Sequence, residues 1–322
     1  MALPAAAGAQ DPPPAPPPAP TPAPTPPPAP PAEGSLALKA QRVHRDGPRR
    51  VVLTRDAWRV RGVVRPYVAG QEVLVRFYRG KRKVHQQSEK VLPARGGRIG
   101  TFLTPYRTKR AGRLAVRAVH KQTPELETLR SKAARVDVMR PRVGSSGPLV
   151  RLLQRGLARM RYAVSRSGSY DSATARAVMA WRKVNGQPRS FEPSETVLRR
   201  VLDGRGAFKV RHPRDGRHVE ADISRQVLAL VDGRKLHRVY HVSSGAPATP
   251  TVLGRFEVYR KDPGTNSLGM VHSTYFIRGY AIHGYASVPP YNASHGCLRV
   301  PIPNAWSIYQ WVRMGDVVRV YP

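Results

Sequence analysis

The spacing of apolar residues changes twice along this chain of 322 residues, and this limits the folds that it can adopt. Over residues 35–140, short runs of alternating apolar and polar residues, such as VLVRFY at 73–78, are separated by turns rich in glycine and charge. Such alternation is typical of β-strands that bury one face. Over 141–204 the period becomes helical, and over 205–322 strand patterns return. The sequence therefore predicts a multidomain, mainly β chain with a small helical domain in its middle.

Two apolar stripes mark the helical interval. Residues three, four and seven positions apart share one face of a helix, so the members of each stripe are expected to be core residues. The first stripe consists of Val150, Leu153, Leu157 and Met160, and the second consists of Ala173, Ala177, Val178 and Trp181.

The first 34 residues are mostly proline and alanine. Such a segment cannot form a core and favours extended polyproline conformations, so we predict a disordered spacer over 1–34, with a protein-binding proline motif as the alternative. Its first ten residues end like the cleavage region of a secretory signal but lack a basic start and a long apolar centre, so we expect an incomplete export signal. The sequence nowhere approaches the ~20 consecutive apolar residues of a transmembrane helix.

Two of the intervals resemble known modules. The strand rhythm of residues 60–73 resembles bacterial Ig-like modules, which implies a β-sandwich over 35–140 that acts as a spacer or interaction module, or that binds a ligand. GPLVRLLQ at 147–154 and GSYDSAT at 168–174 resemble the three-helix peptidoglycan-binding domain. That domain usually carries Phe-Gln where this chain has Trp-Arg at 181–182, so glycan binding and a purely structural role both stay open.

A single cysteine, Cys297, lies in SHGCLR at 294–299, shortly after His283. A lone thiol cannot form a disulfide within its own chain. A thiol with the usual pKa of ~8.5 is mostly protonated at neutral pH, so a nucleophilic cysteine needs a nearby base, and His283 is the candidate. Two alternatives remain. The thiol could be an inert buried side chain, or it could bind zinc together with His283, His295 and His272.

The residues around Cys297 suit acyl transfer. Glycine at 296 lets the backbone turn sharply, so the amides of Gly296 and Cys297 can point at the oxygen of a tetrahedral intermediate. His295 and Cys297 would share one face of an extended segment. Ser294 and the carbonyl of Gly284 are candidates to hold a histidine in its useful tautomer.

The same residues resemble the active-site signature of YkuD-type L,D-transpeptidases. The matching segments are YFIRGYAIHG at 275–284, VPPYNASHGCLRVP at 288–301, TPTVLGRFEV at 249–258 and GDVVRV at 315–320. The resemblance runs from about Arg217 to the C-terminus, and it implies a mostly β catalytic domain, which we place at 205–322.

What the resemblance implies can be stated residue by residue. Cys297 would be the acyl-accepting nucleophile and His283 its general base, oriented through the carbonyl of Gly284. The expected oxyanion donors are the backbone amides of His295, Gly296 and Cys297, in a loop that Ser294 buttresses.

Substrate contacts are expected from Arg299, Tyr275 and Tyr285. Arg299 would pair with a carboxylate of the peptide or brace the site. The loop from His283 to Ser294 is shorter than in many members, which affects the shape of the cleft more than the chemistry.

The reaction that the resemblance implies is acyl transfer on peptidoglycan stem peptides, inhibited by carbapenem-type compounds. The thiolate attacks the carbonyl of the third residue, the terminal D-alanine leaves, and an amine of a neighbouring stem resolves the thioester to give a 3→3 cross-link. Water in place of the amine would make the enzyme an L,D-carboxypeptidase. No cofactor or metal is needed for this chemistry, and the chain has no glycine-rich phosphate loop.

Local patterns predict two further elements of the catalytic domain. Residues 225–235 indicate a hairpin that turns at Asp232-Gly233. A helix is predicted after Pro303, capped by Asn304 and burying the apolar side chains that follow it.

The formal net charge of +35 calls for an anionic partner. Lys and Arg are spread through every folded interval without a basic helix or zinc finger, which is a poor match to a nucleic-acid reader, so we expect no nucleic acid as partner and favour the anionic polymers of a bacterial wall. The sequence thus predicts an extracytoplasmic, secreted or wall-associated L,D-transpeptidase. The alternatives are a catalytically silent wall-binding protein and a basic nucleic-acid-associated protein.

Overall fold

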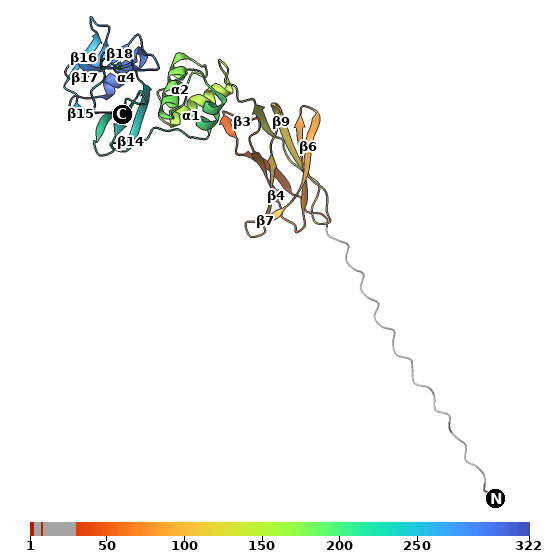
Figure 1. The fold of residues 1–322 in the computed structure, drawn as a ribbon. Coiled ribbons are helices and arrows are strands. Elements are labelled where there is room, and N and C mark those ends of the chain that lie inside the picture. The colour runs from red at the N-terminus through yellow and green to blue at the C-terminus, as the bar shows by residue number, and fades with distance from the viewer. Residues whose placement is uncertain (3–7, 9–29) are drawn as a thin grey trace.

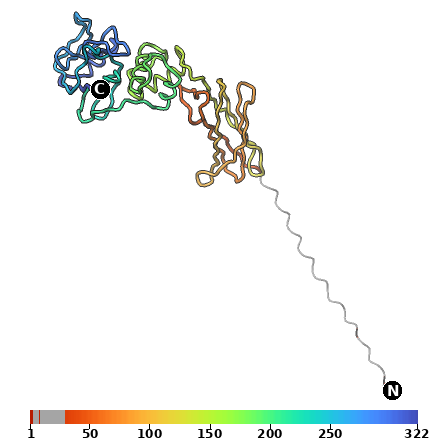
Figure 2. Tube along the Cα trace, viewed as in Figure 1, coloured from red at the N-terminus to blue at the C-terminus, as the bar shows by residue number. Residues whose placement is uncertain are grey.

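The computed structural model describes residues 1–2, 8 and 30–322 of the chain. The predicted export-signal segment and most of the predicted spacer therefore lie outside the described residues. The rest forms three bodies in a bent row, with the helices between a β-rich N-terminal body and a C-terminal body of strands and one helix (Figure 1). The tube in Figure 2 shows that the chain passes through the three bodies once, in sequence order.

The N-terminal body consists of two sheets that share one core. One sheet has the order β1-β4-β8-β7, and the other has the order β2-β3-β11-β9-β5-β6 with β10 paired to β9. Trp58, Phe77 and Leu114 are among its fully buried side chains. The strands are β1 (Ser35–Gln41), β2 (His44–Asp46), β3 (Arg49–Leu53), β4 (Trp58–Arg65), β5 (Glu72–Arg79), β6 (Arg82–Lys90), β7 (Leu92–Ala94), β8 (Ile99–Tyr106), β9 (Gly112–His120), β10 (Leu129–Arg130) and β11 (Ala134–Met139).

The alternation in the sequence explains the burial of these strands. β4 reads WRVRGVVR, and its side chains alternate between buried and more exposed positions, as a strand with one face on a core must. The likeness of this body to bacterial Ig-like modules stays a prediction.

The middle body contains three helices: α1 (Pro148–Arg159), α2 (Ser172–Val184) and α3 (Glu195–Leu202). Asp171 caps α2 by accepting from the Thr174 amide, and Ser194 caps α3 by accepting from the Val197 amide. The two predicted stripes face the helical core, except that Ala173 is only half-buried. The likeness to a peptidoglycan-binding domain stays a prediction.

The C-terminal body contains a five-stranded sheet, β14-β13-β12-β20-β15, and a four-stranded sheet, β16-β17-β18-β19. The predicted hairpin is present as β13 and β14, joined through Gly233. The elements are β12 (Arg217–Asp222), β13 (Val227–Asp232), β14 (Lys235–His241), β15 (Gly254–Glu257), β16 (Arg260–Thr265), β17 (Val271–Ile277), β18 (Tyr280–Tyr285), β19 (Leu298–Pro301), α4 (Ile302–Trp311) and β20 (Val317–Tyr321).

The start of α4 corrects one sequence expectation. The helix begins at Ile302 after Pro301, without a capping side chain, so Asn304 lies inside the helix rather than at its cap. Pro303 fits the first turn because its missing N–H is not needed there. Among the residues that the structure describes, no helix is long and apolar enough to cross a membrane.

The bodies are joined by polar and apolar contacts. Asp46 of β2, which is buried, accepts from Arg151 and Arg155 of α1. The apolar core of the helices continues into side chains of β3 and of β13 and β14, so one hydrophobic cluster touches all three bodies. The helices therefore have a packed interface with the C-terminal body.

Candidate active site

The predicted nucleophile and base lie on two neighbouring parallel strands. β18 carries His283, and β19 begins one residue after Cys297, with His283 in register with Arg299. Paired residues of parallel strands point to the same face, so Cys297 falls on the face of Ala281 and His283. Strand spacing places the Cα atoms of Cys297 and His283 roughly 8 Å apart, within reach of their side chains.

The segment that delivers Cys297 is a sharp bend. Gly296 has a φ of +111°, and a Cβ built on it would lie 1.8 Å from Cε1 of Tyr280. Only glycine fits this conformation and this close approach. The expectation that His295 and Cys297 share a face of an extended segment is therefore wrong, because the backbone turns between them. The His295 side chain is exposed, whereas Cys297 is half-buried.

Ser294 holds the bend from inside. It is 1% exposed, and its Oγ donates to the Cys297 carbonyl at 2.6 Å and accepts from the Gly296 amide at 3.1 Å. The Gly296 amide is thus engaged in the free protein, which leaves the amides of Cys297 and His295 as the candidate oxyanion donors. Behind the bend, the carbonyl of Ser244 accepts from the Ser294 amide.

The imidazole of His283 has a defined tautomer. Its Nδ1 lies 3.0 Å from the Gly284 carbonyl oxygen, and because a carbonyl only accepts, Nδ1 carries the hydrogen and Nε2 has the free lone pair. Burial lowers the pKa of His283, the bond to Gly284 opposes this, and the charge of Arg299 lowers it further. At neutral pH His283 is therefore a neutral base. A side chain at position 284 would meet Ala305 of α4, so glycine also permits this packing.

The thiol of Cys297 is protonated in this environment. Burial raises its pKa, while a backbone hydrogen bond from Ala281 and the charge of Arg299 act in the opposite direction. Its Sγ donates to the Gly279 carbonyl at 3.7 Å. The resting pair is thus a neutral thiol beside a neutral imidazole, and attack on a carbonyl requires proton transfer.

The three predicted substrate residues surround this pair. Arg299 donates to the Ala293 carbonyl at 3.1 Å, and its guanidinium lies 4.1 Å from the Tyr285 ring centroid. The Tyr285 ring stands at 90° to the His283 ring with centroids 5.7 Å apart. Tyr275 is buried in the small cluster against which Cys297 packs. Arg299 therefore braces the loop, and one face of its guanidinium covers Tyr285.

Within the described part of the chain, no group of three or more histidine, cysteine, aspartate or glutamate side chains is arranged to hold a metal ion. His272, named for the zinc alternative, lies on β17 beside Trp306, with ring centroids 4.9 Å apart. Its Nδ1 accepts from the Gly264 amide at 3.1 Å.

The sequence interpretation missed a set of contacts from the helices to the active-site loop. Lys183 of α2 is 2% exposed, and its Nζ lies 2.7 Å from Nδ1 of His241 and 2.8 Å from the Val242 carbonyl oxygen. Nε2 of His241 in turn donates to the Val288 carbonyl at 3.0 Å, and Arg189 donates to the Pro290 carbonyl at 2.9 Å. Both carbonyls belong to the segment between His283 and Cys297. The one sequence signal for these contacts was Lys183 itself, a charged residue in the last turn of a helix whose apolar positions are mostly buried.

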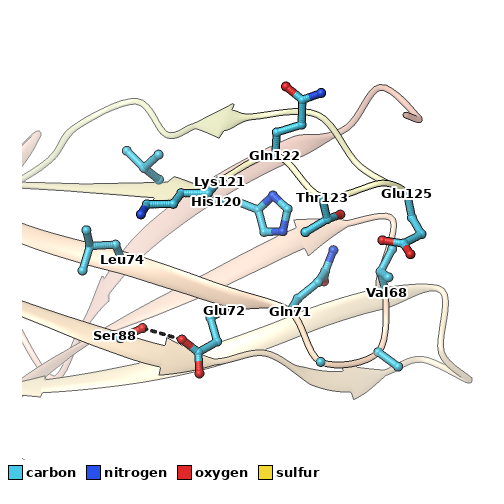
Figure 3. Close-up of a pocket in the computed structure, with 13 residues that line it drawn as sticks. Val68, Gln71, Glu72, Leu74, Ser88, His120, Lys121, Gln122, Thr123 and Glu125 are labelled. Atoms are coloured by element: carbon cyan, nitrogen blue, oxygen red, sulfur yellow. Dashed lines mark hydrogen bonds between the residues drawn. The ribbon is translucent and has the colours of Figure 1, made fainter. Parts of the chain in front are cut away.

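A separate cavity of about 380 Å³ lies in the N-terminal body, away from Cys297. Gln71 and His120 reach into it, and Ser88 donates to Glu72 at 3.0 Å at its edge (Figure 3). Gln71 is 3% exposed, and among the described residues its Oε1 has no hydrogen-bond partner. The predicted alternative of a ligand-binding role for this body stays open.

Comparison with known proteins identifies the C-terminal body. The YkuD family, described as the L,D-transpeptidase catalytic domain, matches residues 216–320. A crystallised L,D-transpeptidase fragment from Xylanimonas cellulosilytica is 31% identical, with a TM-score of 0.52, and the match covers 56% of this chain and 97% of that one. The L,D-transpeptidase from Stackebrandtia nassauensis is 20% identical, with a TM-score of 0.37, and the match covers 56% of this chain and 93% of that one.

The comparison with curated protein sequences found no match. The match to the Xylanimonas fragment spans nearly all of that fragment, at an identity above 30%. The family match covers both strands that carry His283 and Arg299, together with the bend before β19. This chain belongs to the L,D-transpeptidase family.

Proposed function

We propose that the protein is a peptidoglycan L,D-transpeptidase that works through a thioester on Cys297. The proposal rests on the parallel pairing of β18, which carries His283, with β19, which begins one residue after Cys297, and on the bend at Gly296 between the thiol and the buried Ser294. Acyl transfer by a cysteine is served by an accessible thiol, a base close enough to take its proton, and backbone amides that point at the oxyanion.

The chemistry follows from the resting state of the site. Nε2 of His283 takes the proton of the thiol as Sγ attacks the carbonyl of the third stem residue. The amides of Cys297 and His295 stabilise the oxyanion. The imidazolium then gives its proton to the amine of D-alanine, which leaves as the C–N bond breaks. Attack by the amine of a second stem breaks the C–S bond, forms the 3→3 cross-link and returns the proton through His283.

Intact-mass spectrometry tests this proposal. The purified chain is mixed with a tetrapeptide stem or with a carbapenem, and Cys297→Ala is the matched control. We expect a covalent adduct on the parent and none on the variant. His283→Ala should form the stem adduct at least 10²-fold more slowly, because general-base help is typically worth ~10²–10⁴. A folded, reduced protein that forms no adduct with either reagent would indicate a catalytically silent wall-binding protein.

The fate of the adduct separates two outcomes. Added stem amine should release a cross-linked dimer, whereas release of free tripeptide alone would make the protein an L,D-carboxypeptidase.

We further propose that the protein works outside the cytoplasm on the wall. Its charge of +35 supports this, since anionic wall polymers would attract it.

A further inference from the structure

A cavity of about 300 Å³ lies between the helical body and the catalytic strands, and we call it the interdomain pocket. Its volume is at the lower end of the range for small-molecule sites, ~300–1,000 Å³. The helical body contributes Arg176 and Phe191, and β14 and β18 contribute His241 and Tyr285. The segment after β18 contributes Ala286 and Val288, and the end of β19 and the start of α4 contribute Pro301, Ile302 and Pro303.

Tyr285 connects this pocket to the reaction centre. Its ring lines the pocket and also meets the edge of the His283 ring, with centroids 5.7 Å apart. His283 is the group that exchanges a proton with the amine of the peptide bond that is broken or made. The pocket therefore adjoins, through the Tyr285 ring, the base that serves the amine side of the proposed reaction.

Arg176 makes this pocket cationic. Among the described residues its side chain forms no ion pair, and its Nε is buried without a hydrogen-bond acceptor. None of the described residues that line the pocket is acidic. A partly buried guanidinium without a directly paired carboxylate is costly, and a carboxylate that reaches it gains charge-assisted hydrogen bonds. Burial lowers the pKa of Arg176, and the charge of Asp171, which forms no ion pair with it, acts in the opposite direction.

We propose that the interdomain pocket binds the amino acid on the amine side of the scissile bond, and that Arg176 pairs with the carboxylate next to that amine. This rests on the proposed function, since D-alanine is the leaving group of the proposed acylation step. In the first step the leaving D-alanine has a carboxylate on the carbon that carries its amine. In the second step an acceptor with a carboxylate beside its amine would present the same two groups to the pocket. The helical body would then complete the substrate site.

The exchange of D-alanine tests the pocket directly. In this reaction the amine of labelled D-alanine attacks the thioester carbon, the C–N bond forms as the C–S bond breaks, and labelled tetrapeptide replaces unlabelled tetrapeptide. The full chain is given tetrapeptide and either labelled D-alanine or D-alaninamide, which lacks the negative charge. We expect the parent to prefer D-alanine by roughly tenfold or more in kcat/KM.

Substitutions of Arg176 show whether this residue causes the preference for D-alanine over D-alaninamide. Arg176→Gln should raise the KM for D-alanine about tenfold with a smaller change in kcat, and should remove the preference over the amide. Arg176→Lys should keep part of it, because the charge remains. Arg166→Gln, an equal change at an exposed arginine of the same body, is the matched control. Thermal unfolding shows whether each variant is folded.

The outcomes separate this inference from the proposed function. A parent that forms no thioester with tetrapeptide overturns the function. A parent that exchanges D-alanine and D-alaninamide equally well, or an Arg176→Gln variant that matches Arg166→Gln in its KM, overturns the pocket assignment while the function stands. If Arg176→Gln does not fold, the parent's preference and the Lys variant still decide the question.

Discussion

At the scale of single residues, burial keeps both members of the proposed catalytic pair, Cys297 and His283, neutral in the free protein. The raised pKa of Cys297 and the lowered pKa of His283 disfavour a preformed thiolate–imidazolium pair. We expect the rate of alkylation of Cys297 by iodoacetamide to rise with pH, because the thiolate is the reactive form, with an inflection above that of the same thiol in the urea-unfolded chain. An inflection below that of the unfolded chain would indicate an ion pair at rest.

Gly296 has the strictest backbone requirement in the site. Alanine there would combine a φ of +111° with a Cβ 1.8 Å from Tyr280, so the bend must open and the thiol must move. We expect Gly296→Ala to slow adduct formation with carbapenem roughly 10²-fold, since small displacements of reacting groups carry such losses. Gly204→Ala is the control, because Gly204 has a φ of +73° and no atom near its Cβ position. Equal rates for the two variants would contradict the importance of this close approach.

At the scale of elements, α2 supports the loop that precedes the nucleophile. Lys183→Met would leave the Val242 carbonyl and Nδ1 of His241 buried without a donor. We expect a loss of roughly 2 kcal/mol or more in the free energy of unfolding, seen as a lower Tm, together with slower acylation, because His241 holds the Val288 carbonyl. Lys209→Met, at an exposed position, is the matched control. An unchanged Tm would show that these contacts are dispensable.

The elements also show what the sequence can predict. The helical stripes and the β13–β14 hairpin follow from local periodicity and turn residues, so both could be predicted. The motif residues Cys297 and His283 could be recognised by resemblance. Their parallel pairing, the packing of Tyr280 against Gly296 and the reach of Lys183 into another body could not, because each joins residues distant in sequence or depends on tertiary packing.

At the scale of the whole molecule, some acidic side chains form ion pairs between the bodies, whereas most of the positive charge can contact an external partner. Asp46 pairs with Arg151 and Arg155, and Asp56 pairs with Arg199, so these carboxylates join the N-terminal body to the helices. Among the Lys and Arg side chains that the structure describes, only Arg182 and Lys183 are buried, so the excess charge of +35 lies mainly at the surface. Because exposed charges act over about a Debye length, ~10 Å at 0.1 M salt, this surface is expected to bind anionic polymers in a salt-dependent manner.

Retention on purified bacterial walls checks this expectation. The protein should elute as salt rises, and walls stripped of their anionic polymers should retain less of it, because attraction between exposed charges is screened by ions. Cys297→Ala is a suitable test protein, since it keeps the charge but should not become covalently attached. Duplex DNA as a competitor distinguishes a general preference for polyanions from a preference for the wall: DNA that removes the protein from walls at low concentration would favour the nucleic-acid interpretation. Retention that is indifferent to salt would contradict the electrostatic account and point to specific glycan recognition by the helical body.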